Sequence, residues 1–421
     1  MKLKPFSKKQ RKVLNWWVES SPVKNYNGII GDGAIRSGKT VSFWIGFMLW
    51  AMTNFTGQKF GLCGKTHMSF RRNVMSFGKQ ILLDMGYDVY EKRQENLIIV
   101  TKGDRFNEFY IFAGNDERSQ DLVQGVTLAG LFCDEVALMP ESFVNQATSR
   151  CSVEGSKYWF NCNPSNPNHF FKKEWIDKQE LKKLLYLHFT MDDNLSLAED
   201  IKERYKQQYT GVFYQRYILG KWVIAEGSIY DMFDPDIHCY DDGECTPLMK
   251  RNSDRYIACD YGTINPCVFL KIYDDGTDIW VDEEYRWDSK KKQQQKTDME
   301  YAEDMVAFQG DEDFVTIVDP SAASFKLELR NRGLFVKDGD NDVMNGIRAV
   351  ASMLNQKHIH INRQKCQGLI EEMQAYRWDE KAALIGNERP IKSDDHAPDA
   401  LRYDIYTVVP SWRHGVRKDV I

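Results

Sequence analysis

Short apolar runs alternate with stretches of helical periodicity over residues 1–225 of the chain. The clearest runs are Ile29–Ile30, Leu128–Cys133 and Lys157–Phe160. An almost wholly apolar stretch after Thr40 predicts a buried helix. Short strands that alternate with helices are typical of a parallel sheet joined by crossover helices. The sequence therefore predicts an α/β domain over residues 1–225.

A different pattern follows the polar, turn-rich segment Tyr240–Pro247. Three strand-like runs, Tyr256–Asp260, Cys267–Tyr273 and Ile279–Tyr285, are joined by short turns. Consecutive strands with such turns predict an antiparallel meander. We interpret residues 226–253, which precede the meander, as a linker between two domains.

The remainder of the chain alternates helices with strands. We expect a helix at about 296–308, a strand at Phe314–Asp319, a further helix, a strand at Leu334–Lys337, and helices as far as Val409. Three antiparallel strands followed by alternating helices and strands is the element order of an RNase H-like domain. The sequence therefore predicts a second domain, with a mixed sheet, over residues 254–421.

Composition narrows the class of protein. With 42% apolar, 28% charged and 13% aromatic residues, the chain is neither disordered, nor collagen-like, nor a coiled coil. Its longest apolar run, Val41–Met52, is shorter than the ~20 residues that span a bilayer. Met1–Lys12 lacks the apolar core of a signal peptide. We therefore expect a chain without a membrane segment that stays in the cytoplasm.

Charge and cysteine content set two further limits. The net charge of -5 argues against a uniformly basic nucleic-acid binder but leaves room for local basic faces. One candidate face is the run Lys290, Lys291, Lys292 and Lys296, for which an ordinary solvated loop is the alternative. The 9 cysteines are scattered and form no CxxC pair, so we expect small buried side chains rather than zinc ligands.

The strongest chemical signal is Gly33–Thr40, which matches GxxxxGK[ST] between a predicted strand and a predicted helix. Backbone amides of such a loop wrap phosphates at a helix N-terminus. We expect Lys39 to reach the β- and γ-phosphates of ATP and Thr40 to ligate Mg²⁺. The other loop positions predicted to bind nucleotide are Gly33, Arg36, Ser37 and Gly38. A glycine-rich loop without this function is the alternative.

Hydrolysis also needs an acidic pair, and Asp134-Glu135 closes the apolar run that begins at Leu128. Asp134 would hold the Mg²⁺ shell, and Glu135 would orient and deprotonate the attacking water. Asn161 and Asn163 follow the next run, where a neighbouring strand could sense the γ-phosphate. An acidic pair that merely ends a strand and an Asn-Pro turn are the structural alternatives.

Acids in the second domain occur where metal ligands are needed. Asp260 ends the first strand of the meander, Asp319 ends a later strand, and Asp394–Asp399 opens the predicted helix from Ala400 to Val409. Carboxylates from such positions can hold two Mg²⁺ or Mn²⁺ ions about 4 Å apart, which clamp the attacking and leaving oxygens of a phosphodiester. The predicted metal ligands are Asp260, Asp319, Asp395 and Asp399, with His396 beside them. Helix capping by Asp394 and Asp395 and a structural role for His396 are the alternatives.

On these residues the chain resembles the large terminase subunit of tailed bacteriophages over nearly its whole length. The segments that carry the resemblance are Gly33–Thr40, Gly125–Glu135, Asn161–Pro164, Gly227–Tyr230 and His396–Tyr403. The resemblance implies a P-loop NTPase domain of the ASCE type with a parallel sheet, followed by an RNase H-like mixed-sheet nuclease domain. It assigns Lys39, Thr40, Asp134 and Glu135 to ATP hydrolysis, and Asp260, Asp319 and Asp399, with His396, to DNA cleavage.

The same resemblance implies a motor that threads double-stranded DNA through a portal protein into a procapsid and cuts concatemeric DNA. Its partners would be the portal protein, the small terminase subunit and further copies of itself in a ring. The cofactors would be ATP with Mg²⁺ and, for the nuclease, two Mg²⁺ or Mn²⁺ ions. The site of action would be the host cell cytoplasm, and the mature virion would lack the protein. Arg36, Arg71 and Arg72 are all candidates for an arginine finger.

Two other functions are compatible with parts of the pattern. A cellular ATP-dependent DNA repair or recombination nuclease would also pair these two activities, but it would normally carry additional helicase motifs and a longer chain. A non-catalytic DNA-docking scaffold with a dead nucleotide site is opposed by the complete set of acids. The terminase interpretation therefore explains the most residues.

Overall fold

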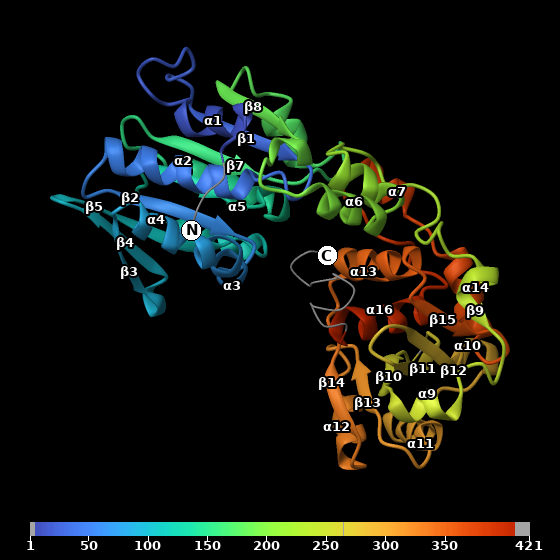
Figure 1. Cartoon of the computed structure of the whole chain (residues 1–421). Coiled ribbons are helices and arrows are strands. Elements are labelled where there is room, and N and C mark those ends of the chain that lie inside the picture. The colour runs from blue at the N-terminus through green and yellow to red at the C-terminus, as the bar shows by residue number, and fades with distance from the viewer. Residues whose placement is uncertain (1–4, 264, 409–421) are drawn as a thin grey trace. The chain divides into compact units, whose positions relative to one another are not determined.

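The computed structural model describes residues 5–263 and 265–408. These residues form two compact units, the first mainly from residues up to Ile224 and the second mainly from residues after it. Figure 1 draws the first unit in blue to green and the second in yellow-green to red. The two units correspond to the two types of element pattern in the sequence.

An eight-stranded sheet forms the centre of the first unit. In order across the sheet the strands are β3 (Asp88–Lys92), β4 (Leu97–Lys102), β5 (Arg105–Ala113), β2 (Lys59–Gly64), β6 (Gly130–Cys133), β7 (Lys157–Asn161), β1 (Gly28–Gly33) and β8 (Leu184–Phe189). Neighbours from β5 to β8 all run parallel, which confirms the predicted α/β sheet. The antiparallel strands β3 and β4 extend one edge. The sequence pattern missed β3 because none of its residues is buried.

The helices of this part of the chain surround a core rich in aromatic side chains. They are α1 (Lys8–Asn15), α2 (Lys39–Asn54), α3 (His67–Phe70), α4 (Ser76–Asp84), α5 (Glu141–Ser149), α6 (Glu199–Gln208) and α7 (Gly211–Phe213). Helix α2 contacts α1, β6 and β7, and its residues Phe43, Trp44, Phe47 and Trp50 are buried. This confirms the predicted core helix, whose first two residues, Lys39 and Thr40, are also the last two of the predicted phosphate-binding motif.

The second unit contains a seven-stranded mixed sheet. Its order is β14 (Phe335–Asp338), β13 (Val315–Val318), β10 (Asp254–Asp260), β11 (Cys267–Asp274), β12 (Ile279–Trp287), β15 (Ile359–Asn362) and β9 (Cys239–Tyr240). Strands β10, β11 and β12 form the predicted antiparallel meander. Strands β13 and β14 join beside β10 in parallel. This order confirms the RNase H-like mixed sheet.

The last helix of the described chain lies within the second unit. The helices of the second unit are α8 (Pro235–His238), α9 (Pro247–Asn252), α10 (Ser289–Lys292), α11 (Asp298–Gln309), α12 (Ala323–Asn331), α13 (Val343–Asn355), α14 (Gln367–Ala375), α15 (Glu380–Leu384) and α16 (His396–Val408). Helix α16 contacts α13, β10, β11 and β13, and all its residues from Ala397 to Tyr406 are buried. It begins at His396, earlier than the predicted Ala400, and Val409 lies outside the described residues.

Residues 226–253, which the sequence suggests to be a linker, carry regular structure of their own. They contain α8, β9 and α9, and β9 pairs in parallel with β15 at the edge of the second sheet. The hydroxyl of Tyr240 donates to a carboxylate oxygen of Asp282 on β12, 3.2 Å away. A strand of two residues has no periodicity to detect, which is why the pattern does not predict it.

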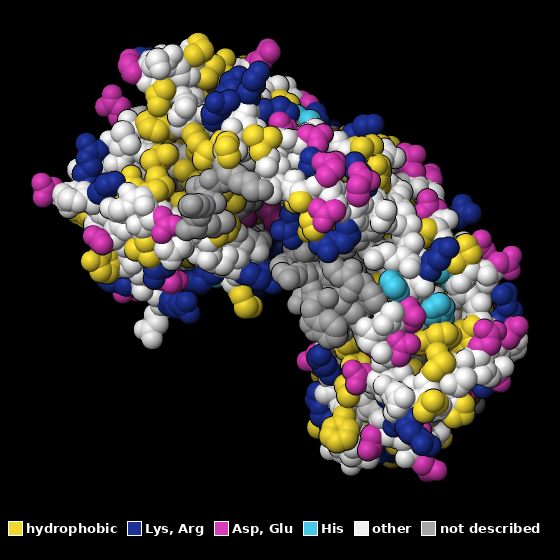
Figure 2. All heavy atoms as spheres, in the orientation of Figure 1, with side chains coloured by type: hydrophobic (Ala, Val, Ile, Leu, Met, Phe, Trp, Pro, Cys, Tyr) yellow, Lys and Arg dark blue, Asp and Glu magenta, His cyan; other side chains and the backbone are white. Residues whose placement is uncertain are grey.

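The helices, the cysteines and the surface charge bear on three predictions made from the sequence. No helix among the described residues is both long and apolar enough to cross a membrane. All 9 cysteines are free thiols, and most of them are buried. On the face drawn in Figure 2, basic and acidic side chains are interspersed over both units. This view therefore shows no uniformly basic surface.

Candidate nucleotide-binding and nuclease sites

The predicted phosphate-binding loop connects the end of β1 to the start of α2. Gly33 has φ +125° and Gly38 has φ +81°, which are backbone conformations that side chains with a Cβ rarely adopt. A Cβ on Gly33 would also lie 2.0 Å from the carbonyl oxygen of Phe189. The two glycines are therefore required by the geometry of the loop. The loop ends at the N-terminus of a sixteen-residue helix, where free N–H groups favour an anion.

The ammonium group of Lys39 lies inside this loop. Its Nζ donates to the carbonyl oxygens of Gly33 and Ala34, at 3.0 and 2.7 Å. It also donates to Ser37 Oγ at 3.2 Å and to Asn163 Oδ1 at 3.1 Å. Burial lowers the pKa of Lys39 to about 8. Asn163, predicted as a phosphate sensor, thus contacts the lysine that is predicted to bind the same phosphates.

Thr40 and Asp134 meet although they belong to different strand-to-helix connections. Thr40 Oγ1 donates to Asp134 Oδ1 at 3.1 Å, and Asn161 Nδ2 donates to the same oxygen at 2.8 Å. Burial, reinforced by the nearby carboxylate of Glu135, raises the pKa of Asp134 to about 7. A hydroxyl and a carboxylate in contact beside a phosphate loop are the two protein ligands that a nucleotide-bound Mg²⁺ needs.

Asn161 also positions the second acid of the pair. Its Oδ1 accepts a hydrogen bond of 3.0 Å from the backbone N–H of Glu135. Glu135 has φ +57°, a strained backbone conformation for a residue with a side chain. Because β7 lies between β1 and β6 in the sheet, Asn161 at its end can reach both acids. One amide side chain therefore fixes the carboxylate of Asp134 and the backbone of Glu135.

The three candidate arginine fingers have different surroundings. Arg36 is exposed in the loop, with its Nε 2.9 Å from the hydroxyl of Tyr205. Arg71 is tied to Glu91 by an ion pair of 3.0 Å and to Asn96 by a hydrogen bond. Arg72 is exposed on the surface. Of the three, Arg36 lies within the predicted nucleotide-binding loop.

The sequence did not reveal the buried acid beneath the loop. Asp32 is fully buried and accepts hydrogen bonds from Tyr186 Oη at 2.8 Å and Trp222 Nε1 at 2.6 Å. His188 Nδ1 lies 2.9 Å from it. An acid within the run Gly28–Gly33 was the available signal, because a charge inside a buried strand needs partners.

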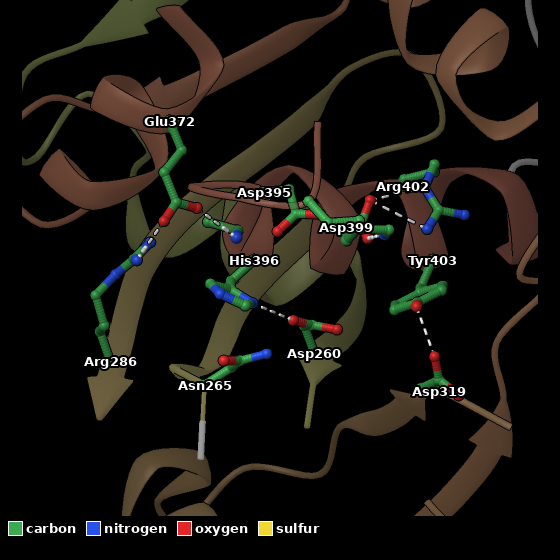
Figure 3. Close-up of polar contacts among 12 residues, drawn as sticks. Asp260, Asn265, Arg286, Asp319, Glu372, Asp395, His396, Asp399, Arg402 and Tyr403 are labelled. Carbon is green, nitrogen blue, oxygen red and sulfur yellow. Dashed lines mark hydrogen bonds and ion pairs between the residues drawn. The ribbon is translucent and has the colours of Figure 1, made fainter. Parts of the chain in front are cut away.

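A second set of reactive side chains gathers at one end of the second sheet. Asp260 ends β10, Asp319 follows the adjacent parallel strand β13, and α16 begins nearby. Figure 3 shows Asp395, His396 and Asp399 at the start of α16, with Asp260 facing His396. All the predicted acids and His396 line one cavity of about 690 Å³. The structure therefore brings together every residue predicted for the nuclease site.

Asp260 and His396 are hydrogen-bonded to each other in this cavity. His396 Nδ1 lies 2.9 Å from Asp260 Oδ2. Burial raises the pKa of Asp260 above its usual value, although the contact with His396 opposes this shift. Burial alone would lower the pKa of His396, but Asp260 raises it above its usual value. The pair is therefore a hydrogen-bonded unit in which each partner stabilises the charged form of the other.

Asp319 and Asp399 are held by side chains to which the sequence analysis assigned no role, and two of these, Arg402 and Tyr403, belong to α16. Tyr403 Oη donates to Asp319 Oδ2 at 2.6 Å, and burial of Asp319 is outweighed by its hydrogen bonds with Ser321 and Tyr403, which lower its pKa. Asp399 Oδ1 accepts from Arg402 Nε and from Tyr376 Oη, each at 3.2 Å. The spacing of Arg402 and Tyr403, three and four residues after Asp399, was the signal available in the sequence, whereas Tyr376 offers none.

The donor chemistry of this cavity fits a divalent cation. Lys392 Nζ lies 3.2 Å from Asp395 Oδ2 and 3.2 Å from Asp399 Oδ2, so a cationic group already stands between two carboxylates. Carboxylate oxygens are the ligands that Mg²⁺ and Mn²⁺ prefer. Within the described part of the chain, however, no three His, Cys, Asp or Glu side chains lie close enough together to surround an ion. Binding would therefore require the acids to converge.

The predicted basic run divides into two parts. Lys290 and Lys291 line the cavity that holds the acids. Lys296 instead is paired with Asp304, and its Nζ lies 3.9 Å from the ring centroid of Trp287. Lys292 also lies over Trp287, at 5.9 Å. Lys290 and Lys291 thus line the candidate nuclease site, where they contact Asn265 and Asp288, whereas Lys292 and Lys296 lie against Trp287.

Comparisons with known proteins identify close relatives. Residues 30–235 match the model of a protein family described as the N-terminal part of the T4likevirus-type terminase large subunit. The large terminase of a thermophilic bacteriophage is 51% identical in sequence, and the match covers 96% of this chain and 100% of that one with a TM-score of 0.92. Structures of the same phage protein with ADP and with ATP-gamma-S match over the same shares, at 51% and 50% identity, each with a TM-score of 0.90. No curated protein matches the chain.

Proposed function

Because the chain belongs to the large terminase family of bacteriophages, we propose that it hydrolyses ATP to move double-stranded DNA and cuts that DNA at a second, metal-dependent site. One observation carries the proposal: each compact unit assembles a full set of reactive side chains from segments far apart in the sequence. In the first unit, 94 residues separate Thr40 from Asp134, and in the second, 136 residues separate Asp260 from His396.

The first unit has the groups that ATP hydrolysis requires. Lys39 would bind the β- and γ-phosphates, and Thr40 and Asp134 would hold Mg²⁺, which neutralises charge on the phosphates. Glu135 would accept a proton from the attacking water, and Asn161 keeps it in place through its backbone N–H. The complexes of the thermophilic phage terminase with ADP and ATP-gamma-S support a nucleotide at this site.

The second unit has the groups for hydrolysis of a phosphodiester. Asp260, Asp319, Asp395 and Asp399 would hold two Mg²⁺ or Mn²⁺ ions, which stabilise charge on the reacting phosphate. His396 orients Asp260 through the 2.9 Å hydrogen bond between them. Tyr403 and Arg402 fix Asp319 and Asp399. Lys290 and Lys291 would contact the DNA backbone beside the acids.

In the infected cell these activities would serve genome packaging. The chain would act in the host cell cytoplasm as a homo-oligomeric ring on the portal protein of a procapsid. The small terminase subunit would deliver concatemeric DNA, and the nuclease would cut it. We place the boundary between the ATPase and nuclease units near residue 225, since the contacts divide there.

A packaging assay tests this function. Purified chain, procapsids with portal, ATP and linear DNA are incubated, and DNA that survives added nuclease inside the capsid is quantified. The wild-type chain should protect DNA, and Lys39→Ala should protect none because it cannot hold the phosphates. Protection by Lys39→Ala at the wild-type level would contradict the proposed motor.

A further inference from the structure

Lys392 contacts two acids of the candidate nuclease site and is itself exposed to solvent. Its Nζ lies 3.2 Å from one oxygen of Asp395 and 3.2 Å from one oxygen of Asp399. The side chains of the two acids are 6% and 7% exposed, whereas that of Lys392 is 62% exposed. An exposed lysine thus lies between two buried carboxylates.

The two carboxylates present one oxygen each to this lysine. The other oxygen of Asp399, Oδ1, is engaged by Arg402 and Tyr376. The Oδ2 atoms of Asp395 and Asp399 therefore point to a common cation position, and Lys392 occupies it. An ammonium group and a divalent ion cannot share this position, because both need the same two oxygens and repel each other.

The side chain of Lys392 borders open space into which it can move away from the two acids. It also lines a second cavity, of about 640 Å³, next to the first. Other residues of that cavity are Arg377, Trp378, Arg389, Pro390 and Ile391. Lys392 precedes α16 in an exposed segment, and its long side chain can change rotamer without moving the helix that carries Asp399.

We propose that Lys392 is a resident counter-ion of Asp395 and Asp399 that a divalent metal ion must displace, so that the lysine sets how readily the nuclease site loads metal. The inference rests on the proposed nuclease function. It assigns Lys392 as a positioning residue that lowers metal affinity. DNA phosphates entering the cavity would offer the displaced ammonium group a new partner, which favours loading when substrate is present.

The test is the affinity of the whole chain for Mn²⁺, measured by calorimetry without nucleotide or DNA. Lys392→Met removes the charge and keeps the apolar stem, and Lys392→Arg keeps the charge. Lys291→Met is the matched control, because Lys291 lines the same cavity but is 85% exposed and pairs with Asp288. Asp395→Asn identifies which binding event belongs to this site.

We expect Lys392→Met to bind Mn²⁺ at least about tenfold more tightly than the wild type, because removing one like charge shifts cation affinity by roughly a decade. Lys392→Arg and Lys291→Met should stay within about twofold of the wild type. Equal or weaker binding by Lys392→Met would overturn the inference while leaving the nuclease site intact. Mn²⁺ binding that Asp395→Asn does not change in any variant would overturn the proposed nuclease site and, with it, the role of Lys392.

Discussion

His396 Nδ1 lies 2.9 Å from Asp260 Oδ2, although 136 residues separate the two in the chain. The contact joins the first residue of α16 to the last residue of β10. A buried carboxylate would otherwise hold its proton more tightly, and the imidazole opposes that rise in the pKa of Asp260. The position of α16 therefore affects both the location and the charge of the central acid.

Replacement of Glu135 should separate nucleotide binding from hydrolysis. Glu135→Gln keeps the size of the side chain but cannot accept a proton from water, so ATP turnover should fall by at least ~100-fold while ATP still binds. Phosphate release and equilibrium binding of a fluorescent ATP analogue measure the two effects. Lys39→Ala is the contrast and should lose binding. Unchanged turnover by Glu135→Gln would remove Glu135 from the role of general base.

The two asparagines after β7 should give different defects. Asn161 contacts Asp134 and the N–H of Glu135, so Asn161→Ala should lower kcat by about tenfold with little change in ATP affinity. Asn163 contacts Lys39, so Asn163→Ala should mainly weaken ATP binding. Steady-state kinetics with a parallel Kd measurement distinguish them. Identical defects in both variants would mean that the contacts have no separate functions.

Lys290 and Lys291 should contribute to DNA binding through phosphates. Replacing both by Ala should weaken binding to all sequences and reduce the slope of log affinity against log salt by about 2. Lys296→Ala is the matched control, since Lys296 is paired with Asp304 and contacts Trp287. It should lower thermal stability and leave the slope unchanged. An unchanged slope for the double variant would make these lysines ordinary surface residues.

Asp404 predicts a pH dependence of stability. It is fully buried, neither of its oxygens has a hydrogen-bond partner among the described residues, and burial raises its pKa to about 8. The folded chain keeps this proton up to about pH 8, whereas the unfolded chain releases it near pH 4, so the free energy of unfolding falls as pH rises between these values.

Asp404→Asn removes the titration. The melting temperature of the variant should therefore rise relative to that of the wild type as pH increases from about 5 to about 8.5. The corresponding relative gain in the free energy of unfolding is on the order of several kcal/mol. Asp394→Asn, which changes an exposed acid, should show no such trend. A difference between Asp404→Asn and wild type that is the same at both pH values would show that Asp404 does not keep its proton in the folded chain.

In both sites, the residues that lie at or just after the end of a strand were predictable from the sequence. Asp134 and Asn161 lie at the ends of parallel strands, and such ends meet at one edge of a sheet, so local patterns place them together. The same holds for Asp260 and Asp319. Asp395 could be placed near Asp399 on the expectation that both are helical, since residues four apart share a helix face, although α16 begins one residue after Asp395.

Contacts made by long-range packing were not predictable. The hydrogen bonds of Asp32 with Tyr186 and Trp222 depend on how β8 and a later loop fold back against β1, and no local pattern records this. Lys392 belongs to an irregular segment without periodicity. Strand β15 is only four residues long, and its strand character depends on pairing with β12.

We infer that the chain contains two active sites that work independently. ATP turnover and nicking of supercoiled DNA in the presence of Mn²⁺ should be measured side by side on the full chain for wild type, Glu135→Gln, Asp260→Asn and the control Asp394→Asn. Asp394 is a suitable control because it lines the same cavity, is exposed, and has a left-handed backbone that Asn tolerates. We expect Glu135→Gln to nick without hydrolysing ATP, Asp260→Asn to hydrolyse ATP without nicking, and Asp394→Asn to do both. Full nicking by Asp260→Asn, or loss of both activities in either single variant, would contradict the account.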